Sequence, residues 1–124
     1  MPGRILLVTA VDETHRTLLL ESQGYVVDVC HSNETLRCLR QLSYDVVLAT
    51  TESDVEACIE ICRVVKQEFP QVRVGIVARG SDIVPDQVWI DAVIWQEGSP
   101  ARFIAAVKKL VEAGEQSHPA SSAE

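Results

Sequence analysis

The most restrictive feature of the sequence is a short apolar run near its middle, residues 46–49 (VVLA), which has polar residues on both sides. The run contains two β-branched residues and predicts a β-strand. A strand without polar alternation is buried on both faces, which is typical of a parallel sheet covered by helices. Residues that follow such a strand lie at the carboxyl edge of the sheet, where α/β proteins place their functional groups. We therefore expect Thr50, Thr51 and Glu52 at the candidate site.

The rest of the chain predicts four further strands, separated by helical segments. These strands are expected at residues 4–8, 25–30, 72–78 and 92–95. Helices are expected at about residues 14–23, 33–42, 54–69 and 100–113, with a short helical segment around 85–90. Strand and helix thus alternate five times, which requires a parallel sheet with right-handed crossovers and helices on both faces. We predict an α/β fold with three layers.

Composition narrows the class of protein. A chain of 124 residues is long enough for one domain with its own core. The net charge of −7 argues against nucleic acid as a direct partner, which would require a basic surface. No apolar run reaches the roughly 18 residues of a membrane span, and the N-terminus shows no signal peptide. We expect a cytoplasmic protein with a domain at 1–113 and a flexible tail or linker at 114–124, where Ser, Ala, Pro and Glu dominate.

The four cysteines, Cys30, Cys38, Cys58 and Cys62, form no CxxC pair. We interpret them as small apolar core residues of a protein in a reducing compartment. A metal site with His31 and disulfide pairing are the alternatives. Zinc sites generally use tighter, recurring spacings, so the sequence favours the core interpretation.

Several segments, taken in order, resemble receiver domains of the two-component response-regulator family. They are RILLV at 4–8, Gly24-Tyr25, YDVVL at 44–48, ARGSD at 78–82 and Ser99-Pro100. The similarity covers about residues 4–113. It implies a flavodoxin-like (βα)5 three-layer sandwich, whose five-stranded parallel sheet has the order 2-1-3-4-5.

The resemblance also implies a particular chemistry. In receivers, acidic residues after the first strand and a phosphoacceptor aspartate ending the third strand hold Mg²⁺. A lysine after the fifth strand neutralises the transferring oxygens, and a hydroxyl after the fourth binds the new phosphate. Here the acidic pair is replaced by Thr9 and Ala10, the phosphoacceptor by Thr50, the hydroxyl by Val77 or Ala78, and the lysine by Gln96. We therefore expect a pseudo-receiver that has lost phosphorylation and binds no metal or cofactor.

The alignment leaves one alternative for the acidic pair. The first strand–helix segment is slightly shorter than in the family, so Asp12 and Glu13 could shift toward the metal position. Their other interpretation is a helix cap and first-turn charges that favour the helix dipole. In either case Thr50 is no substitute acceptor, because a hydroxyl needs an adjacent general base and neither Gln96 nor Thr9 is one. We expect Gln96 to form a local hydrogen bond to loop backbone or to Thr50.

Without phosphorylation chemistry, the function has to lie in the protein's surfaces. We predict a non-enzymatic, phosphorylation-independent module for protein interaction or dimerisation in signal transduction. In the family, the face formed by helix four, strand five and helix five makes such contacts. Its candidate residues here are Trp89, Val93, Trp95 and Phe103. The alternative for the two tryptophans is that they fill the core.

Two other functions remain open. The chain could be a conditional receiver that is modified at, or binds a small ligand in, the altered pocket around Thr9, Thr50 and Gln96. It could also be a small flavodoxin-like enzyme or nucleotide binder. Against the enzyme, the sequence contains no GxGxxG, Walker or nucleophile-elbow motif.

Overall fold

The computed structural model describes residues 3–9, 14–51, 55–80, 82, 84 and 89–123, with side chains as far as residue 113. Five parallel strands form one sheet in the order β2-β1-β3-β4-β5. The strands are β1 (Arg4–Val8), β2 (Val26–Cys30), β3 (Val46–Thr50), β4 (Arg73–Ala78) and β5 (Ala92–Trp95). The helices are α1 (Thr14–Glu21), the 3-10 turn η1 (Ser32–Glu34), α2 (Thr35–Gln41), α3 (Val55–Glu68) and α4 (Pro100–Ala123).

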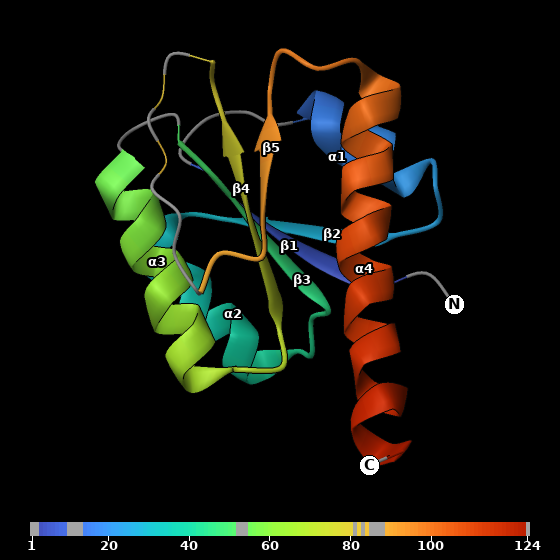
Figure 1. Cartoon of the computed structure of the whole chain (residues 1–124). Coiled ribbons are helices and arrows are strands. Elements are labelled where there is room, and N and C mark those ends of the chain that lie inside the picture. The colour runs from blue at the N-terminus through green and yellow to red at the C-terminus, as the bar shows by residue number, and fades with distance from the viewer. Residues whose placement is uncertain are drawn as a thin grey trace.

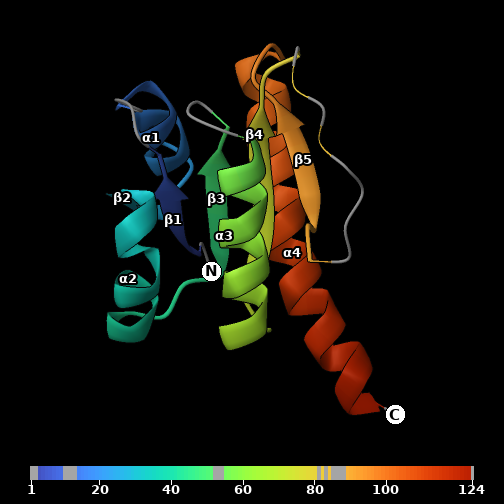
Figure 2. The same cartoon turned by 90° about the vertical axis from the view of Figure 1, so that its left-hand side faces the viewer.

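This arrangement confirms the predicted flavodoxin-like fold and its strand order. Figure 1 shows α2 and α3 on one side of the sheet and α1 and α4 on the other. Figure 2 looks onto α2 and α3, with the sheet behind them. None of the helices in the described part of the chain is long and apolar enough to cross a membrane.

Two expected elements differ from the structure or fall outside it. The short helical segment around 85–90 lies mostly on residues 85–88, which are outside the described part of the chain. Helix α4 runs to Ala123, so the helical backbone continues past residue 113, where the composition predicts an end. The division into a domain at 1–113 and a linker at 114–124 remains a prediction.

The core is divided by the sheet into two clusters. Neighbouring residues of one strand point to opposite faces, so Leu6 and Val47 belong to the cluster under α2 and α3. Leu7 and Leu48 belong to the cluster under α1 and α4. These four side chains are fully buried. Every residue of β3 is buried, as expected of a central parallel strand.

The cysteines lie on the α2–α3 side of the sheet. Cys30, Cys58 and Cys62 are buried there, and Cys38 packs against them partly exposed. This placement confirms the core interpretation, and all four are free thiols. Burial raises the pKa of Cys30 to about 12, so its thiol stays protonated near neutral pH.

Gly75 of β4 lies against side chains of α4 and β3. A Cβ atom added at Gly75 would lie 2.9 Å from Leu110 Cδ1 and 3.0 Å from Leu48 Cδ2. We expect Gly75→Ala to lower the free energy of unfolding by about 1–3 kcal/mol, because the extra methyl overpacks the core. Urea unfolding measures this change.

Gly80→Ala is the matched control for that substitution. The nearest atom to its added Cβ is Glu97 Oε1 at 3.4 Å, an ordinary contact with a flexible side chain. The control should change the free energy of unfolding by no more than about 0.5 kcal/mol. Equal stability of the two variants would contradict the tight packing of α4 on β4.

Candidate functional site

The candidate site lies where the strands end at the carboxyl edge of the sheet. The strand register pairs Val8 with Ala49, Thr50 with Val77, and Ala78 with Trp95. Residues that follow these strands therefore meet, although they are far apart in the sequence. We use the name carboxyl edge for Thr9, Thr50, Thr51, Asp82 and Gln96.

Two threonine hydroxyls meet at the ends of β1 and β3. Thr50 Oγ1 donates a hydrogen bond to Thr9 Oγ1 over 3.1 Å. Both residues are buried, with 9% of Thr50 and 5% of Thr9 exposed. The backbone N–H of Thr9 also donates to the Cys30 carbonyl over 3.0 Å, which joins this end of β1 to β2. The phosphoacceptor position of the resemblance thus holds a neutral contact between two hydroxyls.

A carboxylate lies one residue further along, between the ends of β3 and β4. Thr51 is fully buried, and its hydroxyl donates to Asp82 Oδ2. The same oxygen accepts the Arg79 backbone N–H over 2.8 Å. Asp82 Oδ1 lies 3.6 Å from Arg79 Nη2, and only 7% of the Asp82 side chain is exposed. The Thr51 hydroxyl first, and then the Arg79 N–H, hold the pKa of Asp82 below its usual range, because both stabilise the charged form.

A second carboxylate joins the ends of β4 and β5. Glu97 Oε2 accepts the backbone N–H of Gly80 over 2.8 Å. Beside it, the Gln96 N–H donates to the Ala78 carbonyl over 2.7 Å, which extends the pairing of β4 with β5 by one residue. Glu97 thus connects the loop after β4 to the residues that follow β5.

The remaining predicted positions divide into three groups. Val77 and Ala78 are fully buried in the core and present no hydroxyl. Gln96 is half-buried at the carboxyl edge, as expected from its place after β5. Ala10, Asp12 and Glu13 lie outside the described residues, so their alignment to the acidic pair remains a prediction. Glu52 lies outside them as well, and its place at the site remains a prediction.

The four residues of the expected interaction face do not form one surface. Phe103 lies on the inner face of α4 and is buried with 7% exposed, so its part of that prediction is wrong. Its side chain points inward because α4 lies on the sheet along the stripe that Phe103 shares with Val107. Trp89 and Val93 pack, partly buried, against the cluster on the other side of the sheet. Trp95 remains, with 46% exposed at the end of β5.

Sequence reasoning placed Thr51 at the site but missed Asp82 and the hydrogen bond that joins the two residues. Asp82 belongs to the ARGSD segment, which served only to support the resemblance. A signal was present, because aspartate in a short glycine-containing loop often accepts a nearby backbone N–H. The Asp82 N–H also donates to the Arg79 carbonyl over 3.0 Å, which closes this turn.

The described residues of the carboxyl edge do not fit a magnesium ion. Mg²⁺ prefers several oxygen ligands, including one or two carboxylates that are free to coordinate it. Thr9 and Thr50 supply neutral oxygens that bind each other, and both oxygens of Asp82 already face donors of the protein. Within the described ranges, no group of three His, Cys, Asp or Glu side chains could hold a metal ion.

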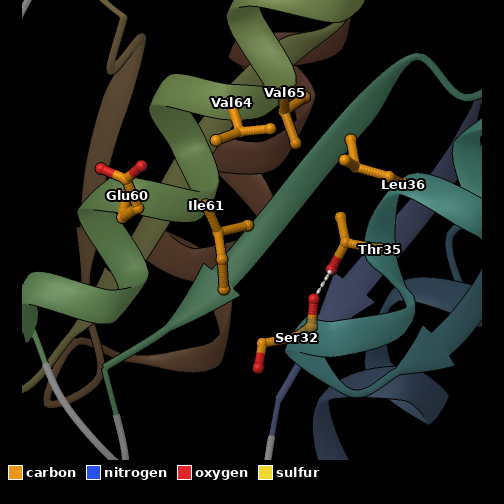
Figure 3. Close-up of a pocket in the computed structure, with 7 residues that line it drawn as sticks. All are labelled: Ser32, Thr35, Leu36, Glu60, Ile61, Val64 and Val65. Atoms are coloured by element: carbon orange, nitrogen blue, oxygen red, sulfur yellow. Dashed lines mark hydrogen bonds between the residues drawn. The ribbon is translucent and has the colours of Figure 1, made fainter.

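A separate cavity of about 180 Å³ lies between η1, α2 and α3 (Figure 3). Its lining residues are mostly apolar: Ser32, Thr35, Leu36, Glu60, Ile61, Val64 and Val65. The Thr35 hydroxyl is directed to the Ser32 carbonyl over 3.0 Å. Glu60, the one charged residue in this lining, is paired with Arg63. The cavity therefore presents apolar surface and shares no residue with the carboxyl edge.

By sequence, the chain matches no protein-family model and no curated protein. Its fold is similar to that of solved structures. NtrX from Brucella abortus superposes with a TM-score of 0.84 at 12% identity, covering 100% of this chain and 30% of that one. The chain thus spans less than a third of NtrX.

Two smaller structures match over almost their whole length. A response regulator receiver domain protein from Clostridium thermocellum gives a TM-score of 0.77 at 20% identity, covering 92% of this chain and 98% of that one. The beryllofluoride-activated NtrC4 receiver domain dimer gives 0.74 at 19% identity, covering 90% and 98%. At these identities the similarity shows that the chain has the receiver fold.

The hydrogen bond from Thr51 predicts how Asp82 titrates. Because the folded protein lowers the pKa of Asp82, its charged form stabilises the fold above the unfolded pKa of about 3.9. This contribution to the stability of the fold is lost as the pH falls through the lower pKa that Asp82 has in the folded protein. We expect Thr51→Val to raise the pKa of Asp82 toward the unfolded value, as measured by NMR titration of its carboxyl carbon.

Thr17→Val is the matched control. It removes a buried hydroxyl of α1 that has no hydrogen-bond partner among the described residues, so the pKa of Asp82 should not move. An Asp82 pKa that is the same in wild type and Thr51→Val would contradict the proposed role of the Thr51 hydroxyl.

Proposed function

We propose that this chain is a receiver-like signalling module that works through protein–protein contacts and is not phosphorylated at Thr50. The hydrogen bond between Thr50 and Thr9 carries this proposal. In a receiver fold, phosphoryl transfer needs a carboxylate nucleophile and bound Mg²⁺ at this position. Two hydroxyls that bind each other supply neither a negative nucleophile nor a general base.

The charges around the site support the same conclusion. The neutral Gln96 stands at the position of the family's lysine and cannot balance the charge of a transferring phosphoryl group. The nearby guanidinium of Arg79 lies against Asp82. The positive charge at this edge is thus directed to a carboxylate of the protein itself. We propose that the chain has no enzymatic activity.

The proposed contact surface is the end of β5. This strand forms one edge of the sheet, and Trp95 exposes 46% of its surface there. Tryptophan is enriched among the residues that dominate binding energy at protein interfaces. The NtrC4 receiver domain with a similar fold was solved as a dimer. We propose that Trp95 contacts a second copy of the chain or another signalling protein.

The loss of phosphorylation is tested with acetyl phosphate and Mg²⁺. We expect the intact mass of the wild type to stay unchanged, because neither a carboxylate nucleophile nor a lysine is in place. Thr50→Asp should also stay unmodified, because Thr9 still stands in place of an acidic residue and Gln96 in place of the lysine. A receiver with intact acidic residues is the positive control.

A gain of one phosphoryl mass in the wild type would contradict the proposal. It would favour the conditional receiver, and mapping the modified residue would then identify the acceptor. A phosphoryl mass gain in Thr50→Asp alone would show that the missing aspartate at position 50 is the main reason why the wild type is not phosphorylated.

The contact surface is tested by sedimentation equilibrium over a range of protein concentrations. We expect Trp95→Ala to weaken self-association about tenfold or more, since hot-spot truncations cost about 2 kcal/mol. Leu18→Ala is the control, because Leu18 is 61% exposed on α1, outside the proposed surface. A wild type that stays monomeric, or an equal effect of both substitutions, would contradict self-association through β5.

A further inference from the structure

The loop after β4 presents two consecutive backbone N–H groups to two carboxylates. The Arg79 N–H donates to Asp82 Oδ2 over 2.8 Å, and the Gly80 N–H donates to Glu97 Oε2 over 2.8 Å. Successive backbone N–H groups of a turn form a concave site that favours anions. In this chain both donors are already used by side chains of the same protein.

Each carboxylate connects the loop to a different strand end. Asp82 also accepts the hydroxyl of Thr51, which follows β3. Glu97 follows β5, next to Gln96, whose N–H is bonded to the Ala78 carbonyl. Hydrogen bonds to a charged acceptor are stronger than those between neutral groups. The loop is therefore held to β3 by one carboxylate and to β5 by the other.

We propose that Asp82 and Glu97 form a built-in latch that takes the place of an external anion at the loop after β4. The latch keeps the ends of β3, β4 and β5 in one arrangement without modification of the chain. Trp95 precedes Glu97 by two residues, so the exposed indole extends from a strand end that the latch holds. This inference goes beyond the proposed function, because it concerns how the loop is held and does not require a partner.

The charged groups around the latch are consistent with this role. Asp82 faces the Arg79 guanidinium at 3.6 Å and is largely shielded from water. Glu97 lies beside the position of a Cβ on Gly80, with all three nearest atoms belonging to its carboxyl group. Each carboxylate thus has its own N–H donor in the loop.

The latch is tested by amide hydrogen exchange, followed by NMR at one fixed pH near neutrality. We expect Glu97→Ala to speed exchange of the Gly80 amide about tenfold, the effect of losing one charge-assisted hydrogen bond in a partly exposed loop. Asp82→Ala should speed exchange of the Arg79 amide by a similar factor. The Leu48 amide in the central strand reports in the same experiment that the fold is intact.

Glu112→Ala is the matched control, because it removes an exposed carboxylate on α4 and should leave both loop amides unchanged. Unchanged exchange at Gly80 in Glu97→Ala would overturn the latch, as would exchange of both loop amides in the wild type at the rate of an unprotected amide. Because Glu97→Ala alters only a surface loop, it keeps the test decisive if Asp82→Ala fails to fold.

An exchange experiment with acetyl phosphate and Mg²⁺ tests the latch and the proposed function independently. With the latch closed, we expect these reagents to leave exchange of the Arg79 and Gly80 amides unchanged. A phosphoryl mass gain with unchanged exchange would contradict the proposed function and leave the latch in place. Slower exchange of the loop amides on phosphorylation would overturn the latch, because it would show that the N–H groups were free to bind the new anion.

Discussion

The structure depends on the complete burial of β3. A strand that is buried on both faces has to pair its backbone on both edges, because unpaired N–H and C=O groups away from water are costly. β3 therefore lies between β1 and β4, and the ends of these strands meet. The polar residues at its carboxyl end, Thr50 and Thr51, are buried with it. Their hydroxyls must find partners within the protein.

The partners of these two hydroxyls determine what the carboxyl edge can do. Thr50 binds Thr9, so the ends of β1 and β3 are joined by a neutral contact. Thr51 binds Asp82, a charged residue of the loop after β4. A metal-dependent transfer site would need those positions to hold carboxylates facing outward. Here the polar groups of the edge are directed to one another.

The strands and their order could be predicted from the sequence. The side-chain contacts between loops could not. The apolar runs predicted all five strands, because a strand that is buried on both faces is visible in the sequence as a continuous run of apolar residues. The meeting of Thr9 with Thr50 follows from strand order. The contact of Thr51 with Asp82 spans 31 residues and depends on a loop conformation that no periodicity encodes. The resemblance puts Phe103 on the interaction face, whereas its helical spacing with Val107 and Leu110 predicts an inward position, and the structure buries it in the core.

An internal carboxylate changes how such a fold could be regulated. A phosphoryl group arrives and leaves, so a receiver that binds one has two states of charge at the loop after β4. Asp82 and Glu97 are covalently part of the chain, so their effective concentration at the loop does not depend on a phosphoryl donor. Under the proposed function, the surface at Trp95 then has a single conformation that does not change with phosphorylation. Signalling through it is governed by the amount of partner and its affinity, because binding follows mass action.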